Sequence, residues 1–184
     1  MKYKIGLVVG RFQPITAGQE LLINTALQNC KTVVILVTSA DKKRTYKNPF
    51  SFDERKSMIE KTFSRHLSSI KILPMNEIKV SNNAEYGSAI LKLVEDKLNT
   101  SIDVFVTSTR KVTWFDNSMK TITVNKYIKP TTAEQIRDKI ILDEDIEGLI
   151  PNAIMSDLEQ MKDIIFDSFD YDLNRLKDDL DDEE

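Results

Sequence analysis

The 184 residues are 41% hydrophobic and 30% charged, a composition typical of one well-packed soluble domain, and the single cysteine, Cys30, excludes a disulfide within the chain. No run of about eighteen apolar residues and no secretory signal core occurs, so we expect a cytoplasmic protein without a membrane segment. The formal net charge of −3 hides a difference between two parts of the chain. Residues 156–184 are acidic, with twelve acidic and three basic residues, whereas the body of the chain, residues 1–155, is basic, with 17 acidic and 23 basic residues. This body suits a small polyanionic substrate, whereas nucleic acid, which favours a dense basic stripe with interleaved aromatic residues, is not expected as a partner.

The first predicted strand is the short apolar run at residues 5–9, which stops at Gly10 and leads through a turn into a helix expected from about Gln19. A strand that ends at glycine and opens onto a helix N-terminus gathers free backbone N–H groups at one point, where phosphate binds well. Arg11 adds a permanent cation whose forked donors match phosphate oxygens.

A second buried strand is predicted at residues 32–37, which are rich in β-branched side chains. Strand, helix and strand in this order predict a right-handed crossover in a parallel sheet, with ligands bound at the carboxyl ends of the strands. The next segment, residues 42–47, carries four basic residues and falls at the same edge. A following helix is expected to begin with Ser51 as N-cap and Glu54 completing a capping box.

Three more strands are predicted at residues 70–74, 102–107 and 121–124, with helices at 89–98 and from Thr132, its expected N-cap. A short helix is also expected around Trp114 and Phe115, whose rings should pack in the interior. The alternation predicts an α/β fold, a doubly wound parallel sheet followed by a C-terminal helical segment.

Beyond Pro151, apolar residues recur at three- or four-residue steps and predict an amphipathic helix that packs on the domain or on a neighbouring subunit. We therefore expect three parts: a domain at residues 1–155, an amphipathic helical segment at 156–177, and an acidic, disordered tail at 178–184.

Four motifs resemble one family, the archaeal-type nicotinamide mononucleotide (NMN) adenylyltransferases, which also form the first domain of bifunctional proteins with a Nudix hydrolase. The run GRFQP at residues 10–14, followed by T-x-G-x, is similar to the family's opening, in which the last four positions read H-x-G-H. Residues 39–59 resemble its second block, residues 131–137 its second nucleotide-binding signature, and residues 143–151 its closing run. The likeness covers residues 6 to about 154, and no glutamate-rich Nudix box occurs.

The resemblance implies a Rossmann-like nucleotidyltransferase that forms NAD and pyrophosphate from NMN, ATP and Mg²⁺, without a dedicated protein metal site, and that assembles as a homo-oligomer. The implied ATP-binding residues are Gly10, Arg11, Phe12, Gly18, Thr132 and Arg137. The implied NMN-binding residues are Asn83, Tyr86, Arg44 and Lys47. The residues expected to act in the transfer are Arg11, Thr16, Gln19, Lys47 and Arg137.

Several positions depart from the family pattern, among them Thr16 at the first signature histidine, and two departures bear most on the chemistry. Gln19 replaces the second signature histidine, and the single histidine of the chain, His66, lies elsewhere in the sequence. Glu134 replaces a hydroxyl residue, and a carboxylate there repels a triphosphate unless it points elsewhere or holds the metal ion. Three hypotheses remain open: an NMN adenylyltransferase with a modified signature, a non-catalytic nucleotide- or NAD-binding relative, and a nucleotidyltransferase for another phosphorylated acceptor.

Overall fold

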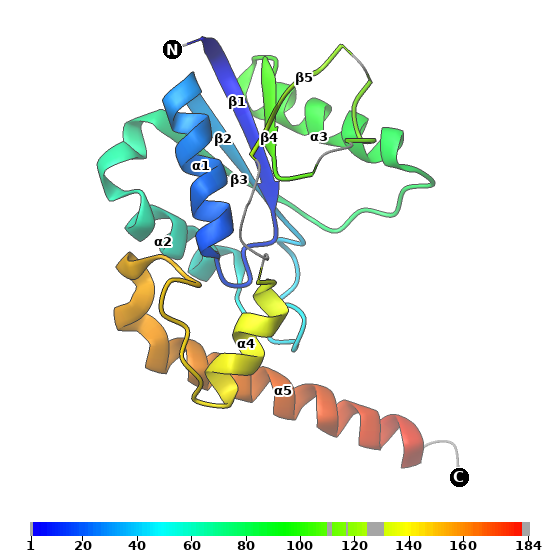
Figure 1. The fold of residues 1–184 in the computed structure, drawn as a ribbon. Coiled ribbons are helices and arrows are strands. Elements are labelled where there is room, and N and C mark those ends of the chain that lie inside the picture. The colour runs from blue at the N-terminus through cyan, green and yellow to red at the C-terminus, as the bar shows by residue number, and fades with distance from the viewer. Residues whose placement is uncertain (1, 110–111, 117, 125–130, 182–184) are drawn as a thin grey trace.

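The computed structural model describes residues 2–109, 112–116, 118–124 and 131–181, with the backbone alone for residues 170–181. Its centre is a five-stranded parallel sheet in the order β3-β2-β1-β4-β5 (Figure 1). The strands are β1 (Tyr3–Gly10), β2 (Cys30–Thr38), β3 (Ile70–Met75), β4 (Val104–Thr107) and β5 (Lys120–Thr123).

The chain builds the sheet outward from β1 to β3, then returns to the other side of β1 and adds β4 and β5. The direction of winding therefore reverses between β1 and β4, where an open α/β sheet binds its ligand at the carboxyl ends of the strands. The predicted doubly wound parallel fold is confirmed.

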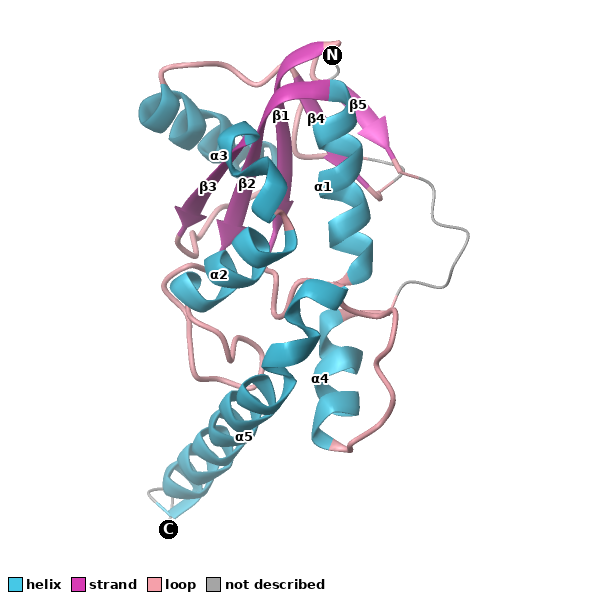
Figure 2. Cartoon of the chain, turned by 90° about the vertical axis from the view of Figure 1, so that its left-hand side faces the viewer, coloured by secondary structure: helices cyan, strands magenta, loops and turns pink. Residues whose placement is uncertain are grey.

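Helices cover both faces of the sheet (Figures 1 and 2). α1 (Ala17–Asn29) and α2 (Phe52–Thr62) lie on one face, and α3 (Asn83–Leu98) lies on the other. Strand β2 shows why its sequence is apolar throughout: Val33, Ile35 and Val37 join the core beside α1 and α2, whereas Val34 and Leu36 join the core beside α3. A short 3₁₀ helix, η1 (Ser64–Ser69), leads from α2 to β3.

The C-terminal elements lie beyond the carboxyl ends of the strands. They are α4 (Ala133–Ile141), a 3₁₀ helix η2 (Asn152–Asp157) and α5 (Leu158–Asp181), which extends away from the sheet (Figures 1 and 2). Ile154, Met161 and Ile165 join the same core as α1 and α2, so the start of α5 is packed on the domain. None of the described helices is long and apolar enough to cross a membrane.

The predicted strands differ from the observed ones by one or two residues at their ends, and larger differences occur at two helix starts and around Trp114. α1 begins at Ala17 rather than near Gln19, and α3 begins at Asn83 rather than at residue 89. The expected helix around Trp114 is wrong, because residues 112–116 form a loop. The division at residues 155 and 177 stays a prediction; α5 continues past residue 177 to Asp181, and residues 182–184 lie outside the described part.

Candidate active site

The loop after β1 is held in place by a buried arginine. Arg55, on α2, is fully buried and donates to the carbonyl oxygens of Arg11 at 2.9 Å and Thr38 at 2.8 Å, and also to those of Ser39 and Ser51. Burial lowers the pKa of its guanidinium to about 10. One side chain therefore ties the ends of β1 and β2 to the start of α2.

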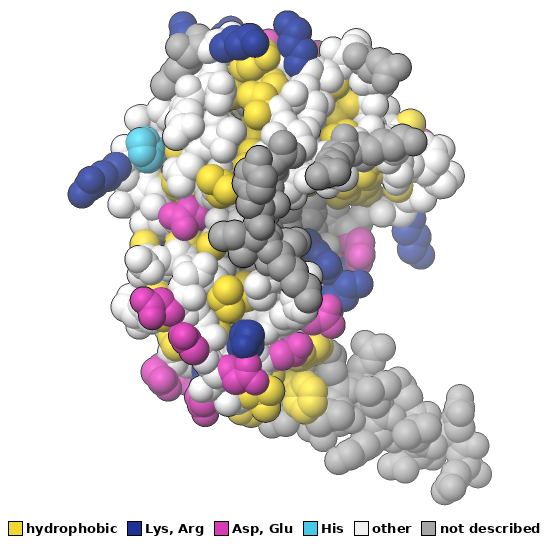
Figure 3. Space-filling view, in the orientation of Figure 1, with side chains coloured by type: hydrophobic (Ala, Val, Ile, Leu, Met, Phe, Trp, Pro, Cys, Tyr) yellow, Lys and Arg dark blue, Asp and Glu magenta, His cyan; other side chains and the backbone are white. Residues whose placement is uncertain are grey.

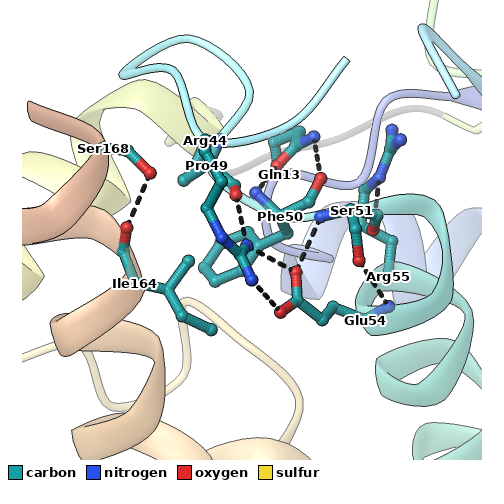
Figure 4. Close-up of polar contacts among 9 residues, drawn as sticks. All are labelled: Gln13, Arg44, Pro49, Phe50, Ser51, Glu54, Arg55, Ile164 and Ser168. Carbon is teal, nitrogen blue, oxygen red and sulfur yellow. Dashed lines mark hydrogen bonds and ion pairs between the residues drawn. The ribbon is translucent and has the colours of Figure 1, made fainter. Parts of the chain in front are cut away.

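A second clamp joins the loop after β1 to the loop after β2. The side chain of Gln13, 2% exposed, accepts from the backbone N–H of Phe50 and donates to the Phe50 carbonyl, both at 2.9 Å (Figure 4). Because these two loops carry Arg11 and Lys47, the clamp fixes the spacing of the backbone segments from which both cations extend.

The first helix begins with a capping box that the sequence interpretation missed. The hydroxyl of Thr16 accepts from the Gln19 backbone N–H at 3.2 Å, and the Gln19 side-chain carbonyl accepts from the Thr16 backbone N–H at 3.0 Å. The spacing T-x-x-Q is the signal that predicts this arrangement. The box turns the Gln19 amide nitrogen toward Gly10, where an added Cβ would lie 3.1 Å from it.

A similar capping box opens α4, where Thr132 is the N-cap, as predicted, and Gln135 closes the box. One turn later, Arg137 is 4% exposed and donates to the Gln13 carbonyl at 2.8 Å. Its Nε has no hydrogen-bond acceptor in the described part, and burial lowers the pKa of the guanidinium.

Tyr46 joins this arginine to the C-terminal helix. Its ring centroid lies 5.2 Å from the Arg137 guanidinium, and its hydroxyl donates to Asp138. Phe169 of α5 packs edge-on against the same ring, with centroids 5.7 Å apart. Burial and then the bond to Asp138 raise the pKa of Tyr46 to about 12, so the phenol stays protonated.

These elements surround a first cavity of about 590 Å³, within the range of about 300–1,000 Å³ that is usual for ligand sites. Its described lining residues are Arg11, Phe12, Gln13, Gln19, Tyr46, Lys47, Thr132, Ala133, Glu134 and Arg137. Three of these side chains are cationic, and Figure 3 shows basic side chains in the hollow above α5. A wall of this kind, between two helix N-termini, is suited to phosphate groups.

A second cavity of about 430 Å³ lies on the other side of the loop after β1. It is lined by Val9, Gly10, Arg11, Thr38, Ser39, Lys47, Asn76, Glu77, Ile78, Tyr86 and Trp114. The rings of Tyr86 and Trp114 stand edge-on with centroids 5.2 Å apart. The lining of the second cavity therefore combines two aromatic rings with the cations Arg11 and Lys47.

Trp114 packs on the core beside α3, as the sequence predicts, and it also lines this cavity, which the sequence interpretation did not predict. Its backbone approaches α3 so closely that a Cβ on Gly87 would lie 1.7 Å from the Trp114 carbonyl oxygen. Glycine inside a helix often marks such an approach, so Gly87 is the signal that was available.

The two cavities share Arg11 and Lys47, and both side chains are exposed. Two anionic ligands, one in each cavity, would therefore bring their charged groups together at the same pair of cations.

The structure brings most of the expected site residues to these walls: Gly10, Arg11, Phe12, Gln19, Lys47, Tyr86, Thr132 and Arg137. Thr16, Gly18, Arg44 and Asn83 line neither cavity. The Thr16 hydroxyl caps α1, and Asn83 donates to the Thr113 hydroxyl at 2.7 Å.

Arg44 lines neither cavity. Its side chain points toward Glu54 at the start of α2 (Figure 4). Its guanidinium makes two hydrogen bonds to the Glu54 carboxylate, at 2.6 and 2.8 Å, and one to the Pro49 carbonyl at 2.9 Å. Arg44 therefore supports the N-terminus of α2 in this structure.

Comparisons with known proteins agree with the fold and the motifs. A family model described as cytidylyltransferase-like matches residues 7–164. The nicotinamide-nucleotide adenylyltransferase of Methanococcus aeolicus is 25% identical over 158 residues, which cover 84% of this chain and 88% of that protein. The enzyme of the same name from Saccharolobus solfataricus is 39% identical over 80 residues, 42% of this chain and 46% of that protein.

Among solved structures, the bifunctional NMN adenylyltransferase/ADP-ribose pyrophosphatase of Francisella tularensis, in complex with AMP and a manganese ion, matches with a TM-score of 0.76 at 27% identity. The match covers 95% of this chain and 54% of the Francisella chain, so this chain corresponds to about half of that protein. With the family model spanning most of its length and the fold in agreement, the chain belongs to the cytidylyltransferase-like family.

Proposed function

We propose that this protein is a nicotinamide-nucleotide adenylyltransferase, which transfers AMP from ATP to NMN and forms NAD and pyrophosphate. The observation that carries the proposal is the pair of cavities that share Arg11 and Lys47. ATP would occupy the cavity between the starts of α1 and α4, and NMN the second cavity. The similarity to nicotinamide-nucleotide adenylyltransferases, over most of the chain in more than one relative, supports the assignment.

In the proposed reaction, an oxygen of the NMN 5′-phosphate attacks the α-phosphorus of ATP. A new bond forms between these atoms, and the bond from the α-phosphorus to the bridging oxygen breaks, so that pyrophosphate leaves with the electron pair. Such a transfer depends on positioning and on neutralising charge more than on acid–base chemistry. Mg²⁺ would enter with ATP as part of the substrate and would offset charge on the phosphates.

Each cavity wall has a proposed task. Arg11 and Lys47 would hold the two reacting phosphate groups together, and Arg137 would bind the phosphates of ATP. The Gln19 amide nitrogen, aimed by the capping box, would donate a hydrogen bond where relatives of the H-x-G-H pattern have histidine. Tyr86 and Trp114 would offer aromatic surface to the electron-poor nicotinamide ring.

The test is a coupled assay for NAD formation from NMN, ATP and Mg²⁺ with wild type, Lys47→Ala and Lys43→Ala. Lys47 lines both cavities, whereas Lys43, on the same loop and also exposed, lines neither. We expect Lys47→Ala to lower kcat/KM by about 100-fold, the effect of losing one donor to the transferred group, and Lys43→Ala to leave it near wild type. Equal effects of both substitutions would contradict the placement of the reaction between the cavities.

The assay also separates the alternatives. Binding of NAD without turnover in wild type would identify a non-catalytic relative. Pyrophosphate release with another phosphorylated acceptor, but none with NMN, would favour a different substrate; a phosphopantetheine adenylyltransferase of Bdellovibrio bacteriovorus is 25% identical over 85% of this chain.

A homo-oligomer remains part of the proposal. Leu142 after α4 is 65% exposed and Phe166 on α5 is 40% exposed, and a contact with a second copy would use apolar side chains of this kind. Light scattering on the purified protein measures the mass directly, and a monomer at all concentrations would contradict this expectation.

A further inference from the structure

One residue of the first cavity, Glu134, has the wrong charge for a site that binds phosphate. Glu134, at the second position of α4, places a carboxylate on a wall otherwise suited to phosphate. Among the residues that the structure describes, no hydrogen bond or ion pair engages this carboxylate. Glu134 lines the same cavity as Arg137. Burial lowers the pKa of the Arg137 guanidinium, and the negative charge of Glu134 partly opposes that shift.

A structural explanation exists, but it is incomplete. An acidic residue in the first turn stabilises a helix through the macrodipole, by about 0.3–1 kcal/mol. The same carboxylate lies beside the position of an anionic ligand, where uncompensated repulsion would weaken binding. Stabilisation of the α4 dipole does not require the acidic side chain to line the cavity, so it does not explain why Glu134 lies there.

The charges of the cavity suggest what offsets this repulsion. Its described lining has three cations, Arg11, Lys47 and Arg137, against one carboxylate, so the wall alone does not neutralise a triphosphate. Mg²⁺ binds in many nucleotide sites through one or two carboxylates together with phosphate oxygens and water. Glu134 supplies such a carboxylate at the place where the phosphates are expected.

We infer that Glu134 is a protein ligand of the divalent cation that enters with ATP, and that the site selects the metal complex of the nucleotide over the free nucleotide. The inference rests on the proposed function in one respect, because it requires a triphosphate in the first cavity. It goes further by assigning a metal ligand and a preference among forms of the substrate. Within the described residues there is no cluster of three or more His, Cys, Asp or Glu side chains able to hold a metal ion, so the nucleotide itself would complete the coordination.

The test measures nucleotide affinity rather than turnover. Calorimetry with an ATP analogue that has a methylene bridge between its α- and β-phosphorus atoms, which cannot transfer AMP, is run with Mg²⁺ and with a chelator. The variants are Glu134→Gln, which removes the charge and keeps the shape, and Glu95→Gln, on an exposed position of α3 outside both cavities. The EPR spectrum of the Mn²⁺ complex of the analogue gives a second readout of the coordination sphere.

We expect wild type and Glu95→Gln to bind the metal complex more tightly than the free analogue. In Glu134→Gln the gain from metal should shrink by about tenfold or more, since even residues that only support a metal ligand account for about 10–100-fold in affinity. The variant should also bind the metal-free analogue more tightly than wild type, because repulsion is removed, and its Mn²⁺ spectrum should change.

Tighter binding of Glu134→Gln under both conditions would mean that Glu134 only repels the nucleotide, and would overturn the inference. Unchanged affinities under both conditions would overturn it as well. In either case binding by wild type would leave the proposed function standing. Failure of wild type to bind the analogue at all would instead contradict both the inference and the assignment of the first cavity to ATP.

Discussion

Two helices begin at the first cavity with the same local sequence, Thr-Ala-x-Gln, and the same capping box. In α1 the bonds that join Thr16 and Gln19 measure 3.0 and 3.2 Å. In α4 the two corresponding bonds between Thr132 and Gln135 measure 2.9 and 3.1 Å, and the Thr132 hydroxyl also donates to the Gln135 side-chain oxygen at 3.3 Å. Local chemistry is therefore alike at the two helix starts. The two glutamine side chains are oriented differently relative to the first cavity, because Gln19 lines it and Gln135 does not.

The remaining position of the pattern differs between the two helices. It is Gly18 in α1, which lines neither cavity, and Glu134 in α4, which lines the first. A third capping box, at the start of α2, is closed by the carboxylate of Glu54 instead of an amide, and this box lies outside both cavities. Neutral amides close the boxes of α1 and α4, so the one carboxylate in the described lining of the first cavity is that of Glu134. The same capping motif thus serves stability at all three helices and contributes a cavity donor at one.

The largest effect that distinguishes α1 from α4 is expected from Gln19→Ala and Gln135→Ala. Each removes the closing side chain of one capping box, so both should lower the free energy of unfolding by a similar amount, about 0.3–1.5 kcal/mol. Gln19→Ala should in addition lower kcat/KM for NAD formation by about 100-fold, because it removes a donor from the cavity, while Gln135→Ala leaves activity near wild type. Equal activities in the two variants would show that the Gln19 side chain contributes no more to NAD formation than the Gln135 side chain, which lies outside the cavity.

Gln19→His tests the same position of α1 by a gain of activity instead of a loss. A protonated imidazole donates a charge-assisted hydrogen bond, which is stronger than that of a neutral amide by about 1–2 kcal/mol, so NAD formation should rise by about tenfold. Gln135→His should have no such effect. A fall in activity as deep as that of Gln19→Ala would mean that the amide, not the position, is what the site requires.

Substitution of Thr16 and Thr132, the N-caps of α1 and α4, tests whether these hydroxyls stabilise the helices or take part in the reaction. Thr16→Ala and Thr132→Ala should each lower the free energy of unfolding by about 1 kcal/mol, measured by urea denaturation, with the larger loss at Thr16, which is 8% exposed. Thr16→Ser keeps the hydroxyl and should restore stability. If Thr16→Ala instead abolished NAD formation in a folded protein, its hydroxyl would belong to the reaction, as the family resemblance implies.

The smallest effect concerns the box of α2. The hydrogen bond from the Arg44 guanidinium is the main cause that lowers the pKa of Glu54 to about 2 from 4.5; burial opposes it, and the Ser51 contacts add to it. A lowered carboxyl pKa stabilises the native state fully above about pH 4.5 and loses that contribution as the pH falls toward 2, since the unfolded chain takes up the proton first.

Arg44→Ala should therefore destabilise the protein at pH 6 by no more than about 1 kcal/mol, because the pair is partly exposed, and the difference from wild type should shrink at pH 3. Urea denaturation at the two pH values measures it. The KM for NMN should stay near wild type; a large rise would place Arg44 in the acceptor site, as the resemblance implies, despite its contacts with Glu54.

The sequence by itself determined the order of strands and helices and the motifs of the family. Apolar runs such as residues 32–37 predict buried parallel strands because both sheet faces are covered, and local patterns such as Ser51 with Glu54 predict caps because their partners are three residues apart. The T-x-x-Q pattern at Thr16 was equally local and therefore equally readable.

Only the tertiary structure decided where side chains point once distant segments meet. It turned Arg44 toward Glu54, brought Trp114 to Tyr86, and set Phe169 of α5 against Tyr46 beside Arg137. It also placed Arg11 and Lys47 on both cavities, from two loops joined by Gln13 and Phe50. These arrangements depend on contacts between residues far apart in the chain, and a one-dimensional pattern records the identity of such residues but not their direction.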